Sequence, residues 1–80
     1  EGRGFIKSTR TVAYEIFRKL KKMNLASGTM VMIKANPAVA ELLSDEERQG
    51  LEDIENTYGI QLIVKEDVKL HQENYEITVL

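Results

Sequence analysis

Two apolar segments with a long helical connection between them constrain the fold of this chain more than any other feature of its sequence. The first, "TMVMIKA" at residues 29–35, and the second, "IQLIVKE" at residues 60–66, have the length and the residue types of strands. A long connection that contains helices joins parallel strands, and such crossovers are right-handed. The sequence therefore predicts a parallel pair of strands with its connecting helices packed against the sheet.

The connection between these segments carries the signals of two helices. Asn36 can cap a helix whose first position is Pro37, where the missing N–H of proline costs nothing. Ser44 and Glu47 have the spacing of a capping box, which predicts that a second helix begins just after Ser44. Gly59 ends this second helix, because glycine adopts the left-handed conformation without strain.

An amphipathic helix is predicted ahead of the first strand, over residues 8–25. Ser8 or Thr9 can cap its first turn, and Asn24 together with Gly28 supplies a stop. Apolar residues recur at helical spacing and form one stripe, which consists of Val12, Ala13, Ile16, Phe17, Leu20 and Met23. We expect this stripe to face the core.

The final segment, "YEITVL" at residues 75–80, alternates apolar with polar residues and reads as a strand with one wet face, antiparallel to the other two. The predicted fold class is therefore α+β. The domain has two layers, a three-stranded mixed sheet with amphipathic helices on one face, in the order helix, strand, helix, helix, strand, strand. Residues 29–35 are apolar on both sides, which favours a central strand. Its second side is covered within the domain or by another chain or domain.

The composition fits one small globular domain. The chain has 80 residues, 42% apolar and 30% charged, and we expect residues 1–80 to form a single domain with residues 1–7 as a flexible or extended lead-in. It contains no cysteine, which excludes disulfides, thiolate metal sites and cysteine nucleophiles within it. The longest wholly apolar run, "MVMI", is too short to span a membrane, so we expect a cytoplasmic protein without a membrane partner.

Charge is divided unevenly along the chain. Residues 1–34 carry eight Lys or Arg and two acids, whereas residues 35–80 carry three Lys or Arg and eleven acids. The basic part includes "RKLKK" on the first helix, and the candidate binding residues on the outward face of that helix are Tyr14, Arg18, Lys21 and Lys22. Such a face can contact phosphates and stack on a base of single-stranded RNA, or it can be an ordinary solvated face that complements the acidic half.

A second candidate contact surface is apolar. Met30 and Met32 point to one side of their predicted strand, opposite to Val31 and Ile33. Unbranched methionine side chains adapt to different partners, so this side can form a contact surface or simply part of the core.

No catalytic or metal-binding constellation is visible in the sequence. His71 is the single histidine, and no nucleophile or carboxylate pattern accompanies it. The acidic run at residues 45–47 fits the first turn of a helix, where consecutive side chains point in different directions. We therefore assign no catalytic residue, no metal ligand and no cofactor to this chain.

Several short motifs follow one another in a distinctive order. The segment "NPAVAELL" is followed by "EERQGLEDIE" and then by "LHQENYEI". The residues that carry this pattern are Asn36, Pro37, Val39, Ala40, Leu42, Leu43, Glu47, Arg48, Leu51, Ile54, Glu55, Leu70, His71, Glu73, Tyr75 and Ile77. Over essentially all 80 residues the chain resembles the C-terminal small domain of the bacterial ribonuclease E/G family, ribonuclease G-like.

The resemblance implies that the chain is a fragment of a metal-dependent endoribonuclease, a hydrolase of RNA processing and decay. In the family the catalytic positions and magnesium carboxylates lie upstream, and none maps onto this chain. Residues 1–4, "EGRG", are similar to the tail of the family's zinc-linking segment, whose cysteines would precede Glu1. The implied role is non-catalytic and structural, in contact with the rest of the parent ribonuclease and other subunits of its oligomer. The alternative is a single-stranded RNA-binding module that uses the basic face of helix 8–25.

Overall fold

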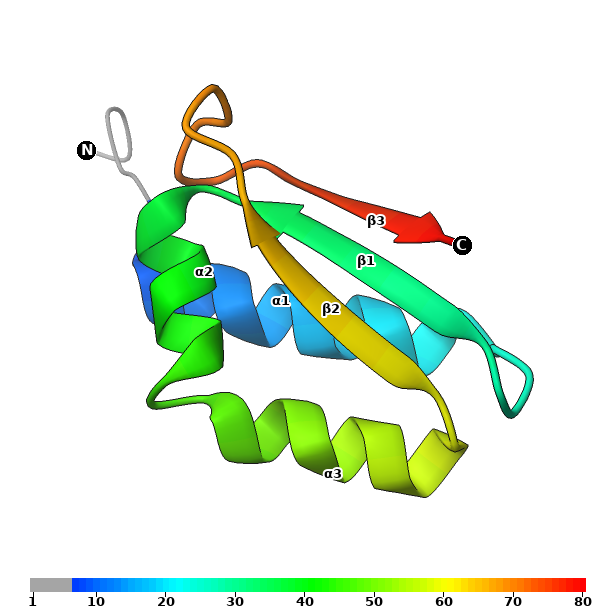
Figure 1. The fold of residues 1–80 in the computed structure, drawn as a ribbon. Coiled ribbons are helices and arrows are strands. Elements are labelled where there is room, and N and C mark those ends of the chain that lie inside the picture. The colour runs from blue at the N-terminus through cyan, green and yellow to red at the C-terminus, as the bar shows by residue number, and fades with distance from the viewer. Residues whose placement is uncertain (1–6) are drawn as a thin grey trace.

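The computed structural model describes residues 7–80, which form three helices and one three-stranded sheet. The elements in chain order are α1 (Thr9–Lys22), β1 (Met30–Ala35), α2 (Pro37–Ser44), α3 (Arg48–Tyr58), β2 (Gln61–Glu66) and β3 (Tyr75–Val79). Figure 1 shows all three helices on one face of the sheet. The predicted α+β class and the predicted order of elements are confirmed. The expected lead-in at residues 1–7 falls mainly outside the described residues.

The sheet has the order β2-β1-β3, so β1 is central as predicted. β1 pairs with β2 in parallel, with Val31 opposite Leu62 and Ile33 opposite Val64. β1 pairs with β3 in antiparallel fashion, with Ile33 opposite Ile77. The parallel pair joined by helices and the antiparallel last strand are both confirmed.

The core lies between the sheet and the helices. The buried side chains that form one cluster are Val12, Ala13, Ile16, Phe17, Leu20, Val31, Ile33, Ala35, Val39, Leu43, Leu51, Ile54 and Ile60. The edge strands contribute half-buried residues such as Leu62, Val64 and Ile77, which pack against this cluster. The stripe predicted on the first helix is therefore the part of α1 that faces the core.

The ends of α1 follow the predicted signals with one shift. The Ser8 hydroxyl accepts a hydrogen bond from the Thr11 N–H at 3.1 Å and caps the helix. The helix ends at Lys22 rather than at residue 25, because Asn24 adopts the left-handed conformation with a φ of 56°. Asparagine tolerates this conformation better than most residues, so the helix stops there.

The predicted capping box at the start of the third helix is wrong. Ser44 is the last residue of α2, and α3 begins at Arg48 after Glu47, whose side chain makes no capping hydrogen bond. The acidic run at residues 45–47 lies in the turn between α2 and α3 and not in the first turn of a helix. The other helix-end signals hold, since the Asn36 side chain caps α2 and Gly59 ends α3 with a φ of 68°.

The predicted helices on one face of the sheet are confirmed, and of the two alternatives for the second side of β1 the described residues do not provide coverage within this domain. Val31, Ile33 and Ala35 are fully buried towards the helices. Met30, Met32 and Lys34 alternate with them and lie on the opposite side, where the described part of the chain places no helix (Figure 1). Three short helices form a single layer, so only one face of the sheet is covered.

Gly50 of α3 lies directly against the Phe17 ring of α1. A Cβ added to this glycine would lie 2.8 Å from Cε2 and 2.9 Å from Cζ of Phe17, which is closer than carbon atoms pack. The Phe17 side chain is itself buried, so its ring has little room to move. The absence of a side chain at residue 50 therefore sets the distance between the two helices.

We predict that Gly50→Ala lowers the free energy of unfolding by about 1–2 kcal/mol. Displacing the Phe17 ring costs about 1–3 kcal/mol, and the better helix propensity of alanine returns less than about 1 kcal/mol. Urea denaturation followed by circular dichroism measures the change. Gln49→Ala, at an exposed position in the same turn, is the matched control and should change stability by about 0.5 kcal/mol at most. Equal stability of the two variants would contradict the close packing.

Candidate functional site

The predicted basic face of α1 is divided between two surface grooves. Arg18 and Lys22 line one groove together with Lys19 and, from β3, Tyr75. Lys21 lines a different groove, between α1 and α3, which it shares with Asp53. All the basic residues named here are exposed, as predicted, but the structure brings together only Arg18 and Lys22 of the candidate set in one concave surface.

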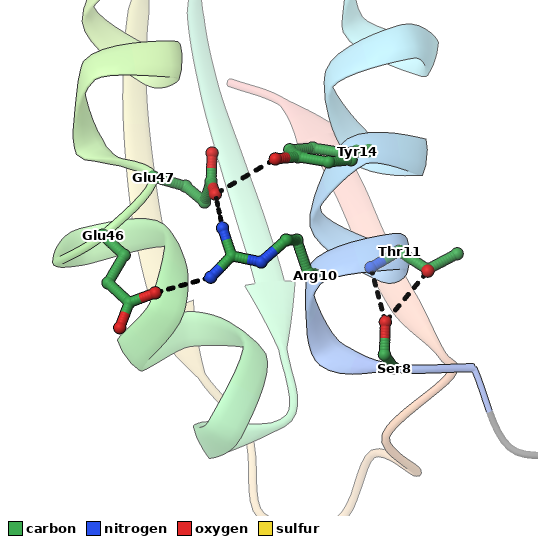
Figure 2. Close-up of polar contacts among 6 residues, drawn as sticks. All are labelled: Ser8, Arg10, Thr11, Tyr14, Glu46 and Glu47. Carbon is green, nitrogen blue, oxygen red and sulfur yellow. Dashed lines mark hydrogen bonds and ion pairs between the residues drawn. The ribbon is translucent and has the colours of Figure 1, made fainter.

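Tyr14 does not line either groove, and its hydroxyl contacts an acidic side chain instead. Its hydroxyl donates a hydrogen bond to the Glu47 carboxylate at 3.3 Å, and its ring lies 6.1 Å from that of Phe17. Arg10, one helical turn earlier, forms ion pairs with Glu47 and, at 2.6 Å, with Glu46. Figure 2 shows these four side chains joining α1 to the turn between α2 and α3. Tyr14 therefore has a structural partner, which competes with stacking on a base.

The remaining charges of α1 differ in how they are neutralised. Lys7 donates to Glu15 at 2.6 Å, and this hydrogen bond, with the charge of Glu15, raises the pKa of Lys7 above its ordinary value. Within residues 7–80 no carboxylate lies at ion-pair distance from the cations of the last two turns, which are Arg18, Lys19, Lys21 and Lys22. As far as residues 7–80 go, the second half of α1 therefore carries an uncompensated positive surface.

The side of the sheet opposite the helices carries an apolar patch. Met32 lies at its centre, with Ile63 beside it on β2 and Met30 one alternation earlier on β1. Met30 and Ile63 are 39% and 42% exposed, and Met32 is half-buried. Polar residues Lys34, Lys65 and Glu76 form the next row across the three strands. We call Met30, Met32 and Ile63 the open-face patch.

The described residues offer no obvious catalytic centre. His71 is exposed in the loop before β3, where its Nδ1 accepts a long hydrogen bond from the Glu73 N–H at 3.3 Å. Among residues 7–80 no three His, Asp or Glu side chains come close enough together to hold a metal ion. In the same part of the chain no helix combines the length and the apolar character that crossing a membrane requires.

The structure is therefore a small α+β domain with two distinctive exposed surfaces, one cationic and one apolar. The chain belongs to the ribonuclease E/G family, because a family model described as the RNase E/G thioredoxin-like domain matches residues 1–80. Relatives described as Ribonuclease G from Salmonella typhimurium and Escherichia coli K12 are each 34% identical over 80 residues, and one from Haemophilus influenzae is 36% identical over 81.

The comparison covers nearly all of this chain but little of its relatives. The alignments include 99% of the chain and 16% of the length of each of these ribonucleases. The ribonuclease E/G resemblance is confirmed, whereas the C-terminal placement that it implied is not confirmed by these matches. The thioredoxin-like description concerns the domain type, since a chain without cysteine cannot carry out thiol–disulfide exchange.

Three residues had not been predicted from the sequence to make the contacts described here. Ile63 joins the open-face patch because the parallel register places it beside Met32. Tyr75 reaches the basic groove because β3 lies at the sheet edge beside α1, and Arg10 meets Glu46 and Glu47 across 36 and 37 residues of sequence. Strand alternation could have suggested Ile63, but the other two depend on tertiary contacts.

We predict that Arg10 and Glu47 are energetically coupled. In a double-mutant cycle with Arg10→Ala and Glu47→Ala, the coupling free energy of unfolding should be about 1 kcal/mol, because the Glu47 side chain is only 14% exposed and also accepts from Tyr14. Urea denaturation of the four chains gives this value. Arg48 and Glu52, an exposed pair within α3, are the control and should couple by about 0.5 kcal/mol or less. Equal coupling in the two cycles would contradict a joining role for Arg10.

Proposed function

We propose that this chain is a non-catalytic structural domain of a ribonuclease E/G-type endoribonuclease. The proposal rests on family membership, on the 16% share of the relatives' length that it spans, and above all on the open-face patch. An exposed apolar cluster at the centre of a sheet is typical of a surface that another protein surface covers. In this proposal residues 1–80 are one domain of the parent chain.

The proposed occupant of the open-face patch is another part of the parent ribonuclease, in the same subunit or in a neighbouring subunit of its oligomer. Met30 and Met32 adapt to the shape of a partner, and Ile63 adds a β-branched contact. The row formed by Lys34, Lys65 and Glu76 provides a polar border on one side of the patch. Covering this face would give β1 the second apolar layer that the domain itself does not supply.

Metal chemistry belongs to other parts of the parent in this proposal. The donor set of this chain supports that division, because it has no cysteine and no cluster of three possible ligands among residues 7–80. Magnesium would be held by upstream carboxylates and zinc by cysteines preceding Glu1, as the resemblance implies. The cytoplasmic location expected from the sequence is part of the same proposal.

We predict that Met30→Lys combined with Ile63→Lys weakens assembly of the full-length parent ribonuclease. The two introduced lysine side chains would be buried in the proposed interface without acidic partners. We expect this to raise the dissociation constant about tenfold or more. Analytical ultracentrifugation measures assembly. Val68→Lys, at a loop position that is 79% exposed, is the control, since it adds charge away from the patch. Unchanged assembly of the double variant, with unchanged thermal stability, would contradict the proposal.

We also predict that the 80-residue chain alone does not cleave RNA in the presence of magnesium. No nucleophile, base and metal-ligand set is assembled among residues 7–80, so the rate should equal that of buffer. A fluorescently labelled single-stranded oligoribonucleotide gives the readout. Preparations of Gly50→Ala, purified in parallel, control for contaminating nucleases. Reproducible magnesium-dependent cleavage that persists through repeated chromatography would contradict a non-catalytic role.

A second candidate function is single-stranded RNA binding by α1, and the uncompensated charges of its last two turns favour it. If Arg18, Lys21 and Lys22 contact phosphates, binding should be weak and should fall steeply with salt. Arg18→Glu with Lys22→Glu should abolish it in an oligouridylate titration followed by NMR. The control variant Lys65→Glu with Lys69→Glu changes the net charge by the same amount at another place. It should leave oligouridylate binding unchanged. Shifts that avoid residues 10–25 would exclude this candidate.

A further inference from the structure

β3 has a hydrogen-bonding edge that the described part of the chain leaves open. Leu80 donates its N–H to the Met30 carbonyl, so the residues of β3 that exchange hydrogen bonds with β1 are the even-numbered ones. In an antiparallel pair the alternate residues then direct N–H and C=O away from the partner strand. These are Tyr75, Ile77 and Val79, and within residues 7–80 none of their outward backbone groups has a backbone partner. Figure 1 shows β3 at the margin of the sheet.

The opposite edge of the sheet is protected at one end of β2. The outward N–H of Leu62 on β2 donates to the Glu55 carboxylate of α3 at 2.8 Å. α2 and α3 run along this edge, and their acidic residues Glu41 and Glu52 line the surface beside it. Side-chain capping and charge of this kind are how proteins prevent a sheet edge from pairing. β3 has no equivalent protection among the described residues.

The open edge of β3 is bordered by cations on the side that faces the helices. Tyr75 lines the same groove as Arg18, Lys19 and Lys22 of α1. Glu15 also lines this groove, but its carboxylate is paired with Lys7 at 2.6 Å, so the three cations outnumber the acids there. Ile77 is half-buried and Val79 is 49% exposed on this side of the sheet, so the edge also presents apolar surface. A strand added here would direct every second side chain towards these cations and apolar groups.

We propose that β3 is a docking edge for an extended acidic segment of a partner protein, which adds to the sheet as a fourth strand antiparallel to β3. Residues of that segment opposite Tyr75, Ile77 and Val79 direct their side chains to the helix side, where carboxylates meet Arg18, Lys19 and Lys22. Their backbone groups pair with the outward groups of β3. The segment therefore carries acids at alternating positions. This surface is distinct from the open-face patch, so the inference goes beyond the function proposed above.

Charge separates this occupant from a second copy of the chain. Antiparallel pairing of two β3 strands about a two-fold axis perpendicular to the sheet would place both α1 helices on the same side of the enlarged sheet. The two uncompensated basic surfaces would then lie next to each other and repel. An acidic strand removes that repulsion. The alternating donors and acceptors of β3 also match a peptide backbone, whereas the phosphates of RNA offer acceptors alone.

The experiment is an NMR titration of the 80-residue chain with a synthetic nonapeptide that alternates Val and Glu. Binding should shift the amide signals of residues 75–79 and slow hydrogen exchange at Ile77 and Val79 severalfold. N-methylation of the Glu residues should abolish binding, because those residues direct both their N–H groups to β3 and their side chains to α1. N-methylation of the Val residues leaves that ladder intact and is the matched control. Because these changes are made in the peptide, folding of the protein is not affected.

Protein variants test the charge contribution. Arg18→Glu with Lys22→Glu should weaken peptide binding about tenfold or more, and Lys65→Glu with Lys69→Glu should change it less than about twofold. Met30→Lys with Ile63→Lys should bind the peptide normally, which separates this inference from the proposed function. Equal binding of the two N-methylated peptides, shifts confined to β2, or oligouridylate protecting residues 75–79 when the peptide does not would each overturn the inference.

Discussion

Burial of one face of the central strand β1 is the interaction on which the rest of the structure depends. Val31, Ile33 and Ala35 are fully buried, and they meet side chains of α1, α2 and α3 in a single cluster. Such burial contributes about 25 cal/mol per Å² of apolar surface, which a domain of 80 residues cannot obtain on both faces of a sheet with one layer of helices. The other face of β1 is exposed for the same reason.

The charges of the chain are divided by the tertiary structure into a paired group and an unpaired group. At the N-terminal end of α1, Lys7 just before the helix pairs with Glu15. Arg10 in the first turn pairs with Glu46 and Glu47. The last two turns carry cations without a carboxylate at ion-pair distance among residues 7–80. The pairs of Arg10 hold α1 against the turn between α2 and α3, whereas the cations of the last two turns are available to an external anion.

For a member of the ribonuclease E/G family this arrangement favours interaction over chemistry. An apolar patch on the sheet and a cationic groove beside an open strand edge are both features that protein or nucleic acid partners recognise. The apolar patch and the cationic groove lie on opposite sides of the sheet, so contact at one surface leaves the other accessible. Both contacts remain compatible with an intact core.

The sequence by itself determined the helices and strands, their order, the parallel and antiparallel pairing, and the stripe of α1 that faces the core. The helices and strands follow from local periodicity and from caps such as Ser8 and Asn36, which act over a few residues. The parallel pairing follows from the length of the helical connection between the two strands. Only the tertiary structure decided that Glu47 pairs with Arg10 instead of capping α3, and that Tyr75 joins the basic groove. Those contacts join residues far apart in sequence, and local patterns carry no information about which distant side chain competes for a carboxylate or lines a groove.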